Sequence, residues 1–327
     1  MQLSEMHDEM GLGPMISLDA GQTIAALPFD RLVEALREMF AAGCEMPVRH
    51  HHTMQVPGEA DATLLLMPAW QAGEFAGVKI ASVFPGNSQR GLPAVNAGYL
   101  LMSGKTGEVL AIIDGGELTA RRTAAASALA ADYLARADAE HLLVAGTGRL
   151  CTNLVQAHAA VRPISKVTVW GRSQDKADAK AREVAALGFD VEGTTDLQSA
   201  LGECDIVSCA TLSSEPLVMG EWLKPGTHVD LVGAFTPNMR ESDDEAMRRA
   251  SVFVDTWAGA LKEAGDIVLA VESGALKSGA IRADLYQLCR NEKPGRLADG
   301  EITLFKSVGA ALEDLAGAIL AYQQTGR

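Results

Sequence analysis

Cysteine and positive charge are both scarce in this chain, and each shortage excludes a kind of protein. The five cysteines are scattered and none forms a Cys-x-x-Cys pair, so the sequence predicts neither a disulfide framework nor a zinc site and fits a reducing, cytoplasmic setting. Lysine and arginine total 28 against 42 acidic residues, which gives a net charge of −14. Because phosphate backbones are bound by basic surfaces, nucleic acid is not expected as a partner.

Long apolar runs are also missing, so we expect no membrane span. The first residues carry Glu5, Asp8 and Glu9 and lack the basic start and apolar core of a signal peptide. What the chain does have is 327 residues, 48% of them hydrophobic, which is enough for two domains with substantial cores.

The most informative motif is a glycine turn between an apolar run and a helical stretch. His141–Ala145 reads as a buried strand, Gly146-Thr147-Gly148 follows, and residues 152–160 have a helical pattern. Gly146 suits a tight turn, Gly148 lets the backbone approach a pyrophosphate, and the helix N-terminus attracts the phosphates. The motif predicts a dinucleotide site, although an ordinary strand-to-helix turn would look similar.

The end of the next expected strand, residues 166–170, bears on the choice of cofactor. An NAD site typically has an acidic residue there for the ribose hydroxyl. Here Arg172 and Ser173 stand at the tip and Lys176 follows one turn later, so a 2′-phosphate would find a guanidinium, a hydroxyl and an ammonium. The sequence therefore favours NADPH, with NADH as the weaker cofactor. A solvated basic turn is the alternative, and Asp175 nearby favours it.

Strand and helix patterns alternate from residue 141 to residue 254 and predict an α/β, Rossmann-type, doubly wound parallel sheet. Longer strands and hairpin-like turns before residue 120 predict a separate α+β domain for substrate binding and dimerisation. Its strands are expected at 22–26, 45–55, 62–68, 77–84 and 97–114, and a helix at 30–42. An alanine-rich helix at 119–135 joins the two, and the chain is expected to return to the first domain near its end. The predicted domains are 1–120 with 301–327, and 121–300.

Several blocks, spread in order over nearly the whole chain, resemble the ornithine cyclodeaminase/μ-crystallin family. They are Gly77–Ile80, Phe84–Asn87, Gly91–Pro93, Leu118–Ala125, Gly146–Cys151, Glu221–Gly226, Val232–Ala234 and Ile302–Gly309. The resemblance implies a homodimer in which an α+β domain forms the interface and a Rossmann domain binds NAD(P). It also implies an enzyme, since the family contains cyclodeaminases, amino-acid dehydrogenases and imine reductases.

The resemblance assigns two arginines and one lysine to the substrate. Arg49 and Arg122 match the family's arginines that grip the substrate carboxylate, which is sound chemistry for bidentate, charge-assisted bonds. Taken alone, Arg49 would read as a surface strand arginine, and Arg122 as a helix-start ion pair with Arg121 as its exposed neighbour. Lys79 lies inside an apolar strand, where a lone amine is costly unless it is paired or its pKa is lowered. It matches the family's active-site lysine, although an edge-strand lysine reaching solvent is the alternative.

The histidine run His50-His51-His52 does not read as a metal site, and no metal is expected. Side chains alternate along a strand, so three consecutive histidines cannot share a face, and no thiolate or carboxylate cluster accompanies them. Alternation does place His51 on the face of Arg49. His51 therefore joins Lys79 as a candidate proton donor, unless it is a partly exposed strand residue.

The expected cofactor contacts follow from the turns after the predicted strands. They are Gly146, Thr147, Gly148, Arg149 and Leu150 for the pyrophosphate, Thr211 and Leu212 for the ribose or nicotinamide, and Val232 and Gly233 near the ring.

Two departures from the cyclodeaminase pattern affect the expected reaction. Phe235 stands where the family's aspartate would follow the late strand, and residues 66–70 lack the early glutamate. A pocket with carboxylate clamps and a proton source but no activating acid suits an imine that is already formed. The branch that it resembles reduces Δ1-pyrroline-2-carboxylate to proline, with Δ1-piperideine-2-carboxylate as a second candidate substrate.

Other activities remain open from the sequence. They are a cyclodeaminase, in which Asp230 or Glu241 would replace the missing acid, an alanine-type dehydrogenase and a hydroxyproline dehydratase. A protein that only binds NADPH or another small ligand is a further alternative.

Overall fold

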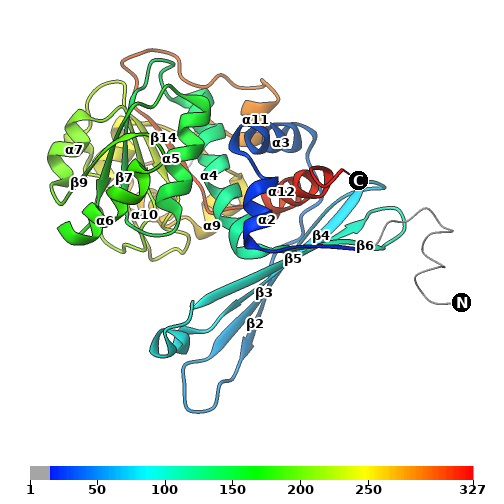
Figure 1. Cartoon of the computed structure of the whole chain (residues 1–327). Helices are drawn as coiled ribbons and strands as arrows, with labels where there is room; N and C mark the ends of the chain where they lie inside the picture. The colour runs from blue at the N-terminus through cyan, green and yellow to red at the C-terminus, as the bar shows by residue number, and fades with distance from the viewer. Residues whose placement is uncertain (1–14, 278, 327) are drawn as a thin grey trace, which may run out of the picture. The chain divides into compact units, whose positions relative to one another are not determined.

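The structure is a computed structural model that describes residues 15–277 and 279–326, in two compact units (Figure 1). Unit 1 contains residues 15–35, 42–122 and 311–326, and unit 2 contains residues 36–41, 123–277 and 279–310. The acidic segment with Glu5, Asp8 and Glu9 lies outside the described residues. Over the ranges that are described, no helix is both long enough and apolar enough to span a bilayer.

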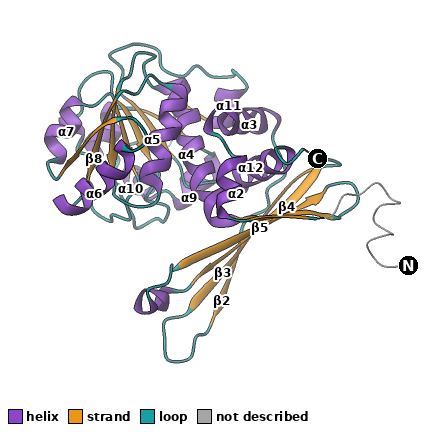
Figure 2. Cartoon of the chain, viewed as in Figure 1, coloured by secondary structure: helices purple, strands orange, loops and turns teal. Residues whose placement is uncertain are grey.

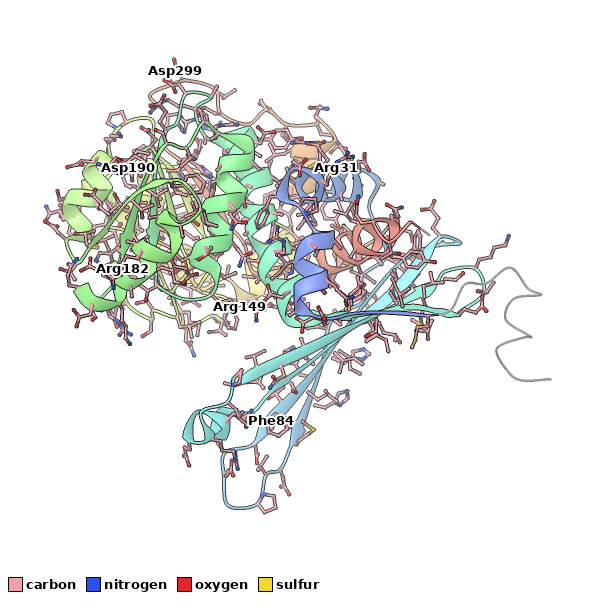
Figure 3. The ribbon with its side chains drawn as sticks, in the orientation of Figure 1. Arg31, Phe84, Arg149, Arg182, Asp190 and Asp299 are labelled. Carbon is pink, nitrogen blue, oxygen red and sulfur yellow. The ribbon has the colours of Figure 1, made fainter. Side chains whose placement is uncertain are left out.

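Unit 1 is built on a six-stranded sheet in the order β1-β6-β5-β4-β3-β2, in which only the β1–β6 pair is parallel. The strands are β1 (Ile16–Leu18), β2 (His50–Met54), β3 (Ala62–Gln71), β4 (Phe75–Val83), β5 (Val95–Ser103) and β6 (Val109–Asp114). A 3-10 helix, η1 (Pro85–Arg90), links β4 to β5. Phe84, labelled in Figure 3, directly follows β4.

One face of this sheet carries the last helix of the chain, α12 (Ala311–Gln323), drawn in red in Figure 1. α12 packs against β3, β4 and β5. Gly77, Lys79 and Ala81 alternate along β4 as its buried residues, whereas Ile80 between them is 44% exposed. Side chains of a strand point alternately to its two faces, so Lys79 lies on the covered face and Ile80 on the other.

The segment predicted as a strand at 22–26 is helix α2 (Ala20–Ala26), so that prediction was wrong. Asp19 accepts a hydrogen bond from the Gln22 N–H at 2.8 Å, and the Gln22 side chain accepts one from the Asp19 N–H at 3.0 Å. This reciprocal capping box fixes the first turn of the helix. The Asp-x-x-Gln spacing was the available signal, and the β-branched residues around it were misleading.

The segment predicted as a strand at 45–55 is a strand only at β2. Glu45 forms an isolated antiparallel bridge with Trp70, and Pro47 stands between this bridge and β2. Proline cannot donate a ladder hydrogen bond, which accounts for the interruption. Helices α3 (Phe29–Ala42) and α4 (Gly115–Leu134) match the helices expected at 30–42 and 119–135, and α4 begins earlier because Asp114 accepts from the Glu117 N–H at 2.7 Å.

Unit 2 is built on an eight-stranded, wholly parallel sheet in the order β13-β12-β14-β11-β10-β7-β8-β9. The strands are β7 (His141–Ala145), β8 (Lys166–Trp170), β9 (Asp190–Thr194), β10 (Ile206–Cys209), β11 (His228–Leu231), β12 (Ser251–Val254), β13 (Ala283–Asp284) and β14 (Thr303–Lys306). This confirms the predicted Rossmann-type fold. Every residue of β7, β10, β11 and β14 is buried, as expected for strands covered on both faces.

Helices connect these strands and surround the sheet, as Figure 2 shows. They are α5 (Leu150–Val161), α6 (Gln174–Ala185), α7 (Leu197–Glu203), α8 (Asp244–Arg249), α9 (Trp257–Glu263), α10 (Gly265–Glu272) and α11 (Leu285–Cys289), with a 3-10 turn η2 (Gly220–Trp222). The strand order reverses between β7 and β10. In open α/β sheets such a switch point opens a crevice at the carboxyl ends of the strands, where ligands bind.

The chain's return to the first domain differs from the predicted boundary at residue 301. β14 lies between β11 and β12 of unit 2, and unit 1 resumes only at Ala311. All four residues of β14 are buried. A continuously buried run is typical of a central parallel strand, and this was the signal in residues 303–306.

Candidate active site

The turn from β7 into α5 forms one wall of a cavity in unit 2. Gly146 has φ 128° and a Cβ there would lie 2.8 Å from the carbonyl oxygen of Ala210, so only glycine fits. Gly148 differs, because a Cβ there would meet nothing within 4 Å. Arg149, labelled in Figure 3, is the N-cap of α5, and its side chain makes no capping hydrogen bond. No side chain caps this first turn, in which the Cys151 N–H donates to the Gly148 carbonyl at 3.2 Å, and the positive end of the helix dipole is left to attract an anion.

The cavity measures about 300 Å³ and lies at the carboxyl ends of three strands, on both sides of the switch point. Its lining residues lie at or after the ends of β7, β8 and β10: Gly146, Thr147, Trp170, Gly171, Arg172, Ala210, Thr211, Leu212, Ser213 and Leu217. A glycine turn, an uncapped helix N-terminus and a cavity at the switch point together fit the pyrophosphate and sugars of a dinucleotide.

The predicted cofactor residues fall into two groups in the structure. Five of them line the cavity: Gly146, Thr147, Arg172, Thr211 and Leu212. The others are not among the lining residues: Gly148, Arg149 and Leu150 at the start of α5, Ser173 and Lys176 at the start of α6, and Val232 and Gly233 after β11.

The rim after β8 is basic. Arg172 and Lys176 are exposed, and Ser173 is the N-cap of α6 without a side-chain capping bond. In the part of the chain that the structure describes, the residues that line the cavity include no carboxylate. An ordinary ribose-binding acid is therefore not part of this lining.

Unit 1 contains a buried cluster of four charged side chains around Lys79. The Lys79 ammonium lies 2.7 Å from Oδ2 of Asp314, and Nε of Arg122 donates to Oδ1 of the same carboxylate at 2.9 Å. Nη1 of Arg122 donates to Glu313 at 2.5 Å. None of the four side chains is more than 6% exposed. Two cations and two carboxylates balance, which is what allows them to be buried.

Burial lowers the pKa of Lys79 from 10.5 to about 8, although Asp314 opposes this effect. For Asp314, burial raises the pKa, but Arg122 and Lys79 outweigh it and the carboxyl titrates below its usual range. An amine with a pKa near 8 changes its proton occupancy close to neutral pH. Lys79 can therefore give or take a proton in a reaction, which an ordinary lysine does poorly.

The two acids of α12 were not among the residues singled out from the sequence. Glu313 and Asp314 stand side by side in a helix that is otherwise mostly apolar. Adjacent acids in a buried helix require buried cations, and this was the available signal. The expected exposed neighbour of Arg122 is also not exposed. Arg121 is 6% exposed, donates from Nε to the Leu27 carbonyl at 2.8 Å and stacks 4.0 Å from the ring centre of Phe29.

Arg49 and His51 lie at the edge of the same sheet. Arg49 is partly buried and directly precedes β2, and His51 is exposed within β2. His51 pairs with Leu65, which pairs with Ala81, so His51 shares the face of Lys79 two strands away. By strand spacing alone the two side chains start roughly 10 Å apart or more. The structure thus brings Arg122 to Lys79 and leaves Arg49 and His51 at the edge.

The three histidines alternate as expected for a strand. The rings of His50 and His52 are 6.4 Å apart, on the face opposite to His51. Among residues 15–277 and 279–326, no group of three histidine, cysteine or acidic side chains is arranged to hold a metal ion.

A Gly148→Ala substitution tests the close approach of a cofactor to the glycine turn. The melting temperature should stay unchanged, because the new methyl meets no protein atom within 4 Å. Affinity for the dinucleotide should fall by about tenfold or more, because the methyl occupies the path of the pyrophosphate. Titration of cofactor fluorescence measures this, with Gly202→Ala in α7 as the control, since its Cβ is equally unobstructed. Unchanged affinity in Gly148→Ala would contradict the assignment.

An Asp314→Asn substitution tests the electrostatics at Lys79. Because Asp314 raises the pKa of this amine against the effect of burial, its removal should shift the pKa below about 8. Side-chain NMR of labelled lysine, assigned with a Lys79→Met sample, measures the midpoint. Asp132→Asn is the control, since Asp132 pairs with Arg37 and Arg162 instead. A midpoint that rises or stays in place would show that Asp314 does not control the proton of Lys79.

Two relatives are similar over most of their length. The chain is 38% identical over 299 residues to the Δ1-pyrroline-2-carboxylate reductase of Paracoccus denitrificans, covering 91% of this chain and 93% of the relative. It is 40% identical over 287 residues to the protein SAR DEFICIENT 4 of Arabidopsis thaliana, covering 85% and 86%.

Three solved structures share the fold. The Thermococcus litoralis Δ1-pyrroline-2-carboxylate reductase, in complex with NADH and L-proline, has a TM-score of 0.87 and 33% identity, covering 95% of this chain and 97% of that one. An archaeal alanine dehydrogenase dimer with bound NAD has a TM-score of 0.85 and 29% identity, covering 95% and 96%. The iminosuccinate reductase of Paracoccus denitrificans with NAD⁺ has a TM-score of 0.86 and 27% identity, covering 95% and 96%.

The family match extends over nearly the whole chain. Residues 20–326 match the family model described as the ornithine cyclodeaminase/mu-crystallin family. This confirms the resemblance that the sequence blocks indicated, and the chain belongs to the ornithine cyclodeaminase/mu-crystallin family.

Proposed function

We propose that this chain is an NADPH-dependent reductase that converts Δ1-pyrroline-2-carboxylate to L-proline. The observation that carries the proposal is Lys79, a buried amine with a pKa of about 8 that can protonate an imine nitrogen near neutral pH. The substrate is suggested by the named reductases of Paracoccus and Thermococcus. Δ1-Piperideine-2-carboxylate, which would give pipecolate, is the second substrate to test.

The roles that we propose for the residues are those that the family resemblance implies, and their charges fit these roles. Arg49 and Arg122 bind the carboxylate of the imino acid, and Lys79 or His51 supplies the proton to nitrogen. A bound nicotinamide supplies the hydride. Because Asp314 and Glu313 already hold Nε and Nη1 of Arg122, this guanidinium is fixed in orientation before a substrate arrives. A donor fixed in advance loses little entropy on binding.

The buried state of two other acids supports reduction over cyclodeamination. Phe235 stands in place of the family's aspartate and is 48% exposed. Asp230 is fully buried and takes a hydrogen bond from the Ser208 hydroxyl at 2.5 Å. Glu241 is also fully buried, and its two oxygens accept bonds from Thr211, Gly233 and Ala234. Because both acids are fully buried, neither reaches the amine of a bound diamino acid without a rearrangement.

We also propose that the protein acts as a homodimer in the cytoplasm. The sheet of unit 1 exposes apolar side chains on the face opposite to α12, with Ile80 44%, Ile112 41% and Val109 37% exposed. An apolar patch of this kind is typical of an interface. The archaeal alanine dehydrogenase with the same fold is described as a dimer.

The five cysteines form no disulfide, which suits a reducing compartment.

The direct test of the proposed function is oxidation of NADPH with Δ1-pyrroline-2-carboxylate, followed at 340 nm. Arg49→Ala should raise KM for the imino acid by about tenfold to a hundredfold, because a charge-assisted bond to the carboxylate is lost. Arg31→Ala, an exposed arginine labelled in Figure 3, is the control and should leave KM unchanged.

Other outcomes of this assay discriminate among the alternatives. Ammonia release from ornithine without net cofactor consumption would indicate a cyclodeaminase. Cofactor binding without turnover of any imine would indicate a binding protein. Either result would refute the reductase proposal.

Arg172→Ala tests the preference for NADPH. The dissociation constant of NADPH should rise about tenfold or more, since the guanidinium would pair with the 2′-phosphate, while that of NADH should change less than about twofold. Arg182→Ala, an exposed arginine of α6 labelled in Figure 3, is the control. Equal losses for both cofactors would remove Arg172 from the 2′-phosphate site.

Ile80→Asp tests the dimer. A carboxylate within the exposed apolar face should shift the protein to monomer in sedimentation experiments at micromolar concentration. Ile24→Asp, at a position that is 43% exposed in α2, should leave the dimer intact. A wild-type monomer, or an Ile80→Asp dimer as stable as the wild type, would contradict the proposed interface.

A further inference from the structure

Three buried charged side chains form a cluster next to the turns that follow β10 and β11. The roles proposed above do not account for this cluster. Glu241, Asp266 and Lys306 are each 0% exposed. Nζ of Lys306 lies 3.1 Å from Oδ2 of Asp266 and 3.9 Å from Oε2 of Glu241. Oδ1 of Asp266 accepts bonds from the Glu241 N–H at 2.9 Å and the Ser242 N–H at 2.8 Å. Lys306 thus lies near the charge of Glu241, and Asp266 holds the backbone N–H of Glu241.

The Glu241 carboxylate joins the residues that follow two neighbouring strands. Its Oε1 accepts from the N–H and the hydroxyl of Thr211 at 2.7 and 2.8 Å, in the turn after β10. Its Oε2 accepts from the N–H groups of Gly233 and Ala234 at 2.8 and 3.2 Å, after β11. The two turns are in close contact, since a Cβ on Gly233 would lie 1.9 Å from the Thr211 carbonyl oxygen.

Thr211 connects this cluster to the cofactor cavity, because it lines the cavity together with Ala210 and Leu212. In a doubly wound sheet the dinucleotide crosses the switch point, with its adenosine half over the strands on the β8 side. The nicotinamide half therefore belongs to the other side, at the turns after β10 and β11. These are the two turns that Glu241 holds.

We propose that Glu241 is a positioning residue for the nicotinamide half of the cofactor, acting through Thr211 and Gly233. The carboxylate does not touch the cofactor. It accepts four hydrogen bonds from donors of the two turns that would otherwise be unpaired. It thereby fixes the backbone on which the nicotinamide ribose rests. The adenosine half, over β8, is independent of Glu241.

The ionised form of Glu241 is the one that can accept all four bonds. Burial raises the pKa of this carboxyl from 4.5 to about 7, while Lys306 opposes the shift and Asp266 adds to it. Among the described residues, the Cys209 thiol also lies near it, and burial raises the pKa of this thiol well above 9.0. Protonation turns one acceptor oxygen into a donor, so affinity for the nicotinamide half should fall as the pH drops through about 7.

Glu241→Gln separates this role from general stability when two ligands are compared by calorimetry. NADH carries both halves of the cofactor and no 2′-phosphate that would titrate in this range. ADP carries only the adenosine half and the phosphates. Glu241→Gln should raise the dissociation constant of NADH by about fivefold to a hundredfold, because a buried N–H loses its acceptor. The dissociation constant of ADP should change less than twofold.

A matched control and a pH series complete the test. Glu245→Gln in α8, whose side chain is 45% exposed, should behave as the wild type with both ligands. NADH affinity of the wild type should fall from pH 8 to pH 6 and should be flat in Glu241→Gln. Parallel weakening of NADH and ADP, unchanged NADH affinity, or a pH dependence that survives in Glu241→Gln would each overturn the proposal. Should Glu241→Gln fail to fold, Thr211→Val removes one of the four bonds and should weaken NADH alone.

Discussion

The chemistry proposed for unit 1 depends on the two ion pairs that the carboxylate of Asp314 forms. Its two oxygens are divided between Lys79 and Arg122, so one side chain of α12 orients two cations that come from β4 and α4. Removing one partner from a buried ion pair typically costs about 3–5 kcal/mol, because the other charge is left without compensation. The loss of any one member would therefore leave an unpaired buried charge, whereas the four charges together sum to zero. The cluster holds the amine of Lys79, whose pKa lies near neutrality.

Unit 2 uses buried carboxylates to hold backbone rather than side-chain cations. Oδ2 of Asp255 accepts from the Ser307 hydroxyl at 3.0 Å and from the Val308 and Gly309 N–H groups at 2.7 and 2.8 Å, which fixes the turn after β14. Glu241 does the same for the turns after β10 and β11. Turns at the carboxyl ends of parallel strands carry many N–H groups without a ladder partner, and an ionised carboxylate satisfies several at once. The mouth of a Rossmann sheet is thereby kept in one conformation.

Local patterns were sufficient for much of the fold. β7 and β8 have the bounds that were predicted, because each is a short apolar run next to glycine or polar residues. The glycine turn and the basic tip of β8 could be placed for the same reason. α2 was misjudged because β-branched residues outweighed its capping box, and the boundary at residue 301 was misplaced because the buried run of β14 was assigned to the first domain. The error at α2 did not affect the family resemblance, whose blocks begin at Gly77.

The site was only partly accessible from the sequence, and the reason is separation along the chain. The bonds from Arg122 to Glu313 and Asp314 span 191 and 192 residues. Periodicity reports which face of an element is buried but not which partner it meets. Lys79 was recognisable because an amine in an apolar strand needs a compensating group, yet the identity of that group required the fold. Glu241 was noted only as a substitute acid, and its bonds to Thr211 and Gly233 give it a different place.

Transfer of deuterium from labelled cofactor tests the account most directly. The protein would be incubated with Δ1-pyrroline-2-carboxylate and with one of two NADPH samples, each of which carries deuterium on one of the two faces of nicotinamide C4. The product of each incubation would be analysed by mass spectrometry. The account predicts L-proline with one deuterium at C2 from one of the two labelled cofactors and none from the other. Proline without label from both cofactors, or no proline at all, would contradict hydride reduction of a preformed imine by this chain.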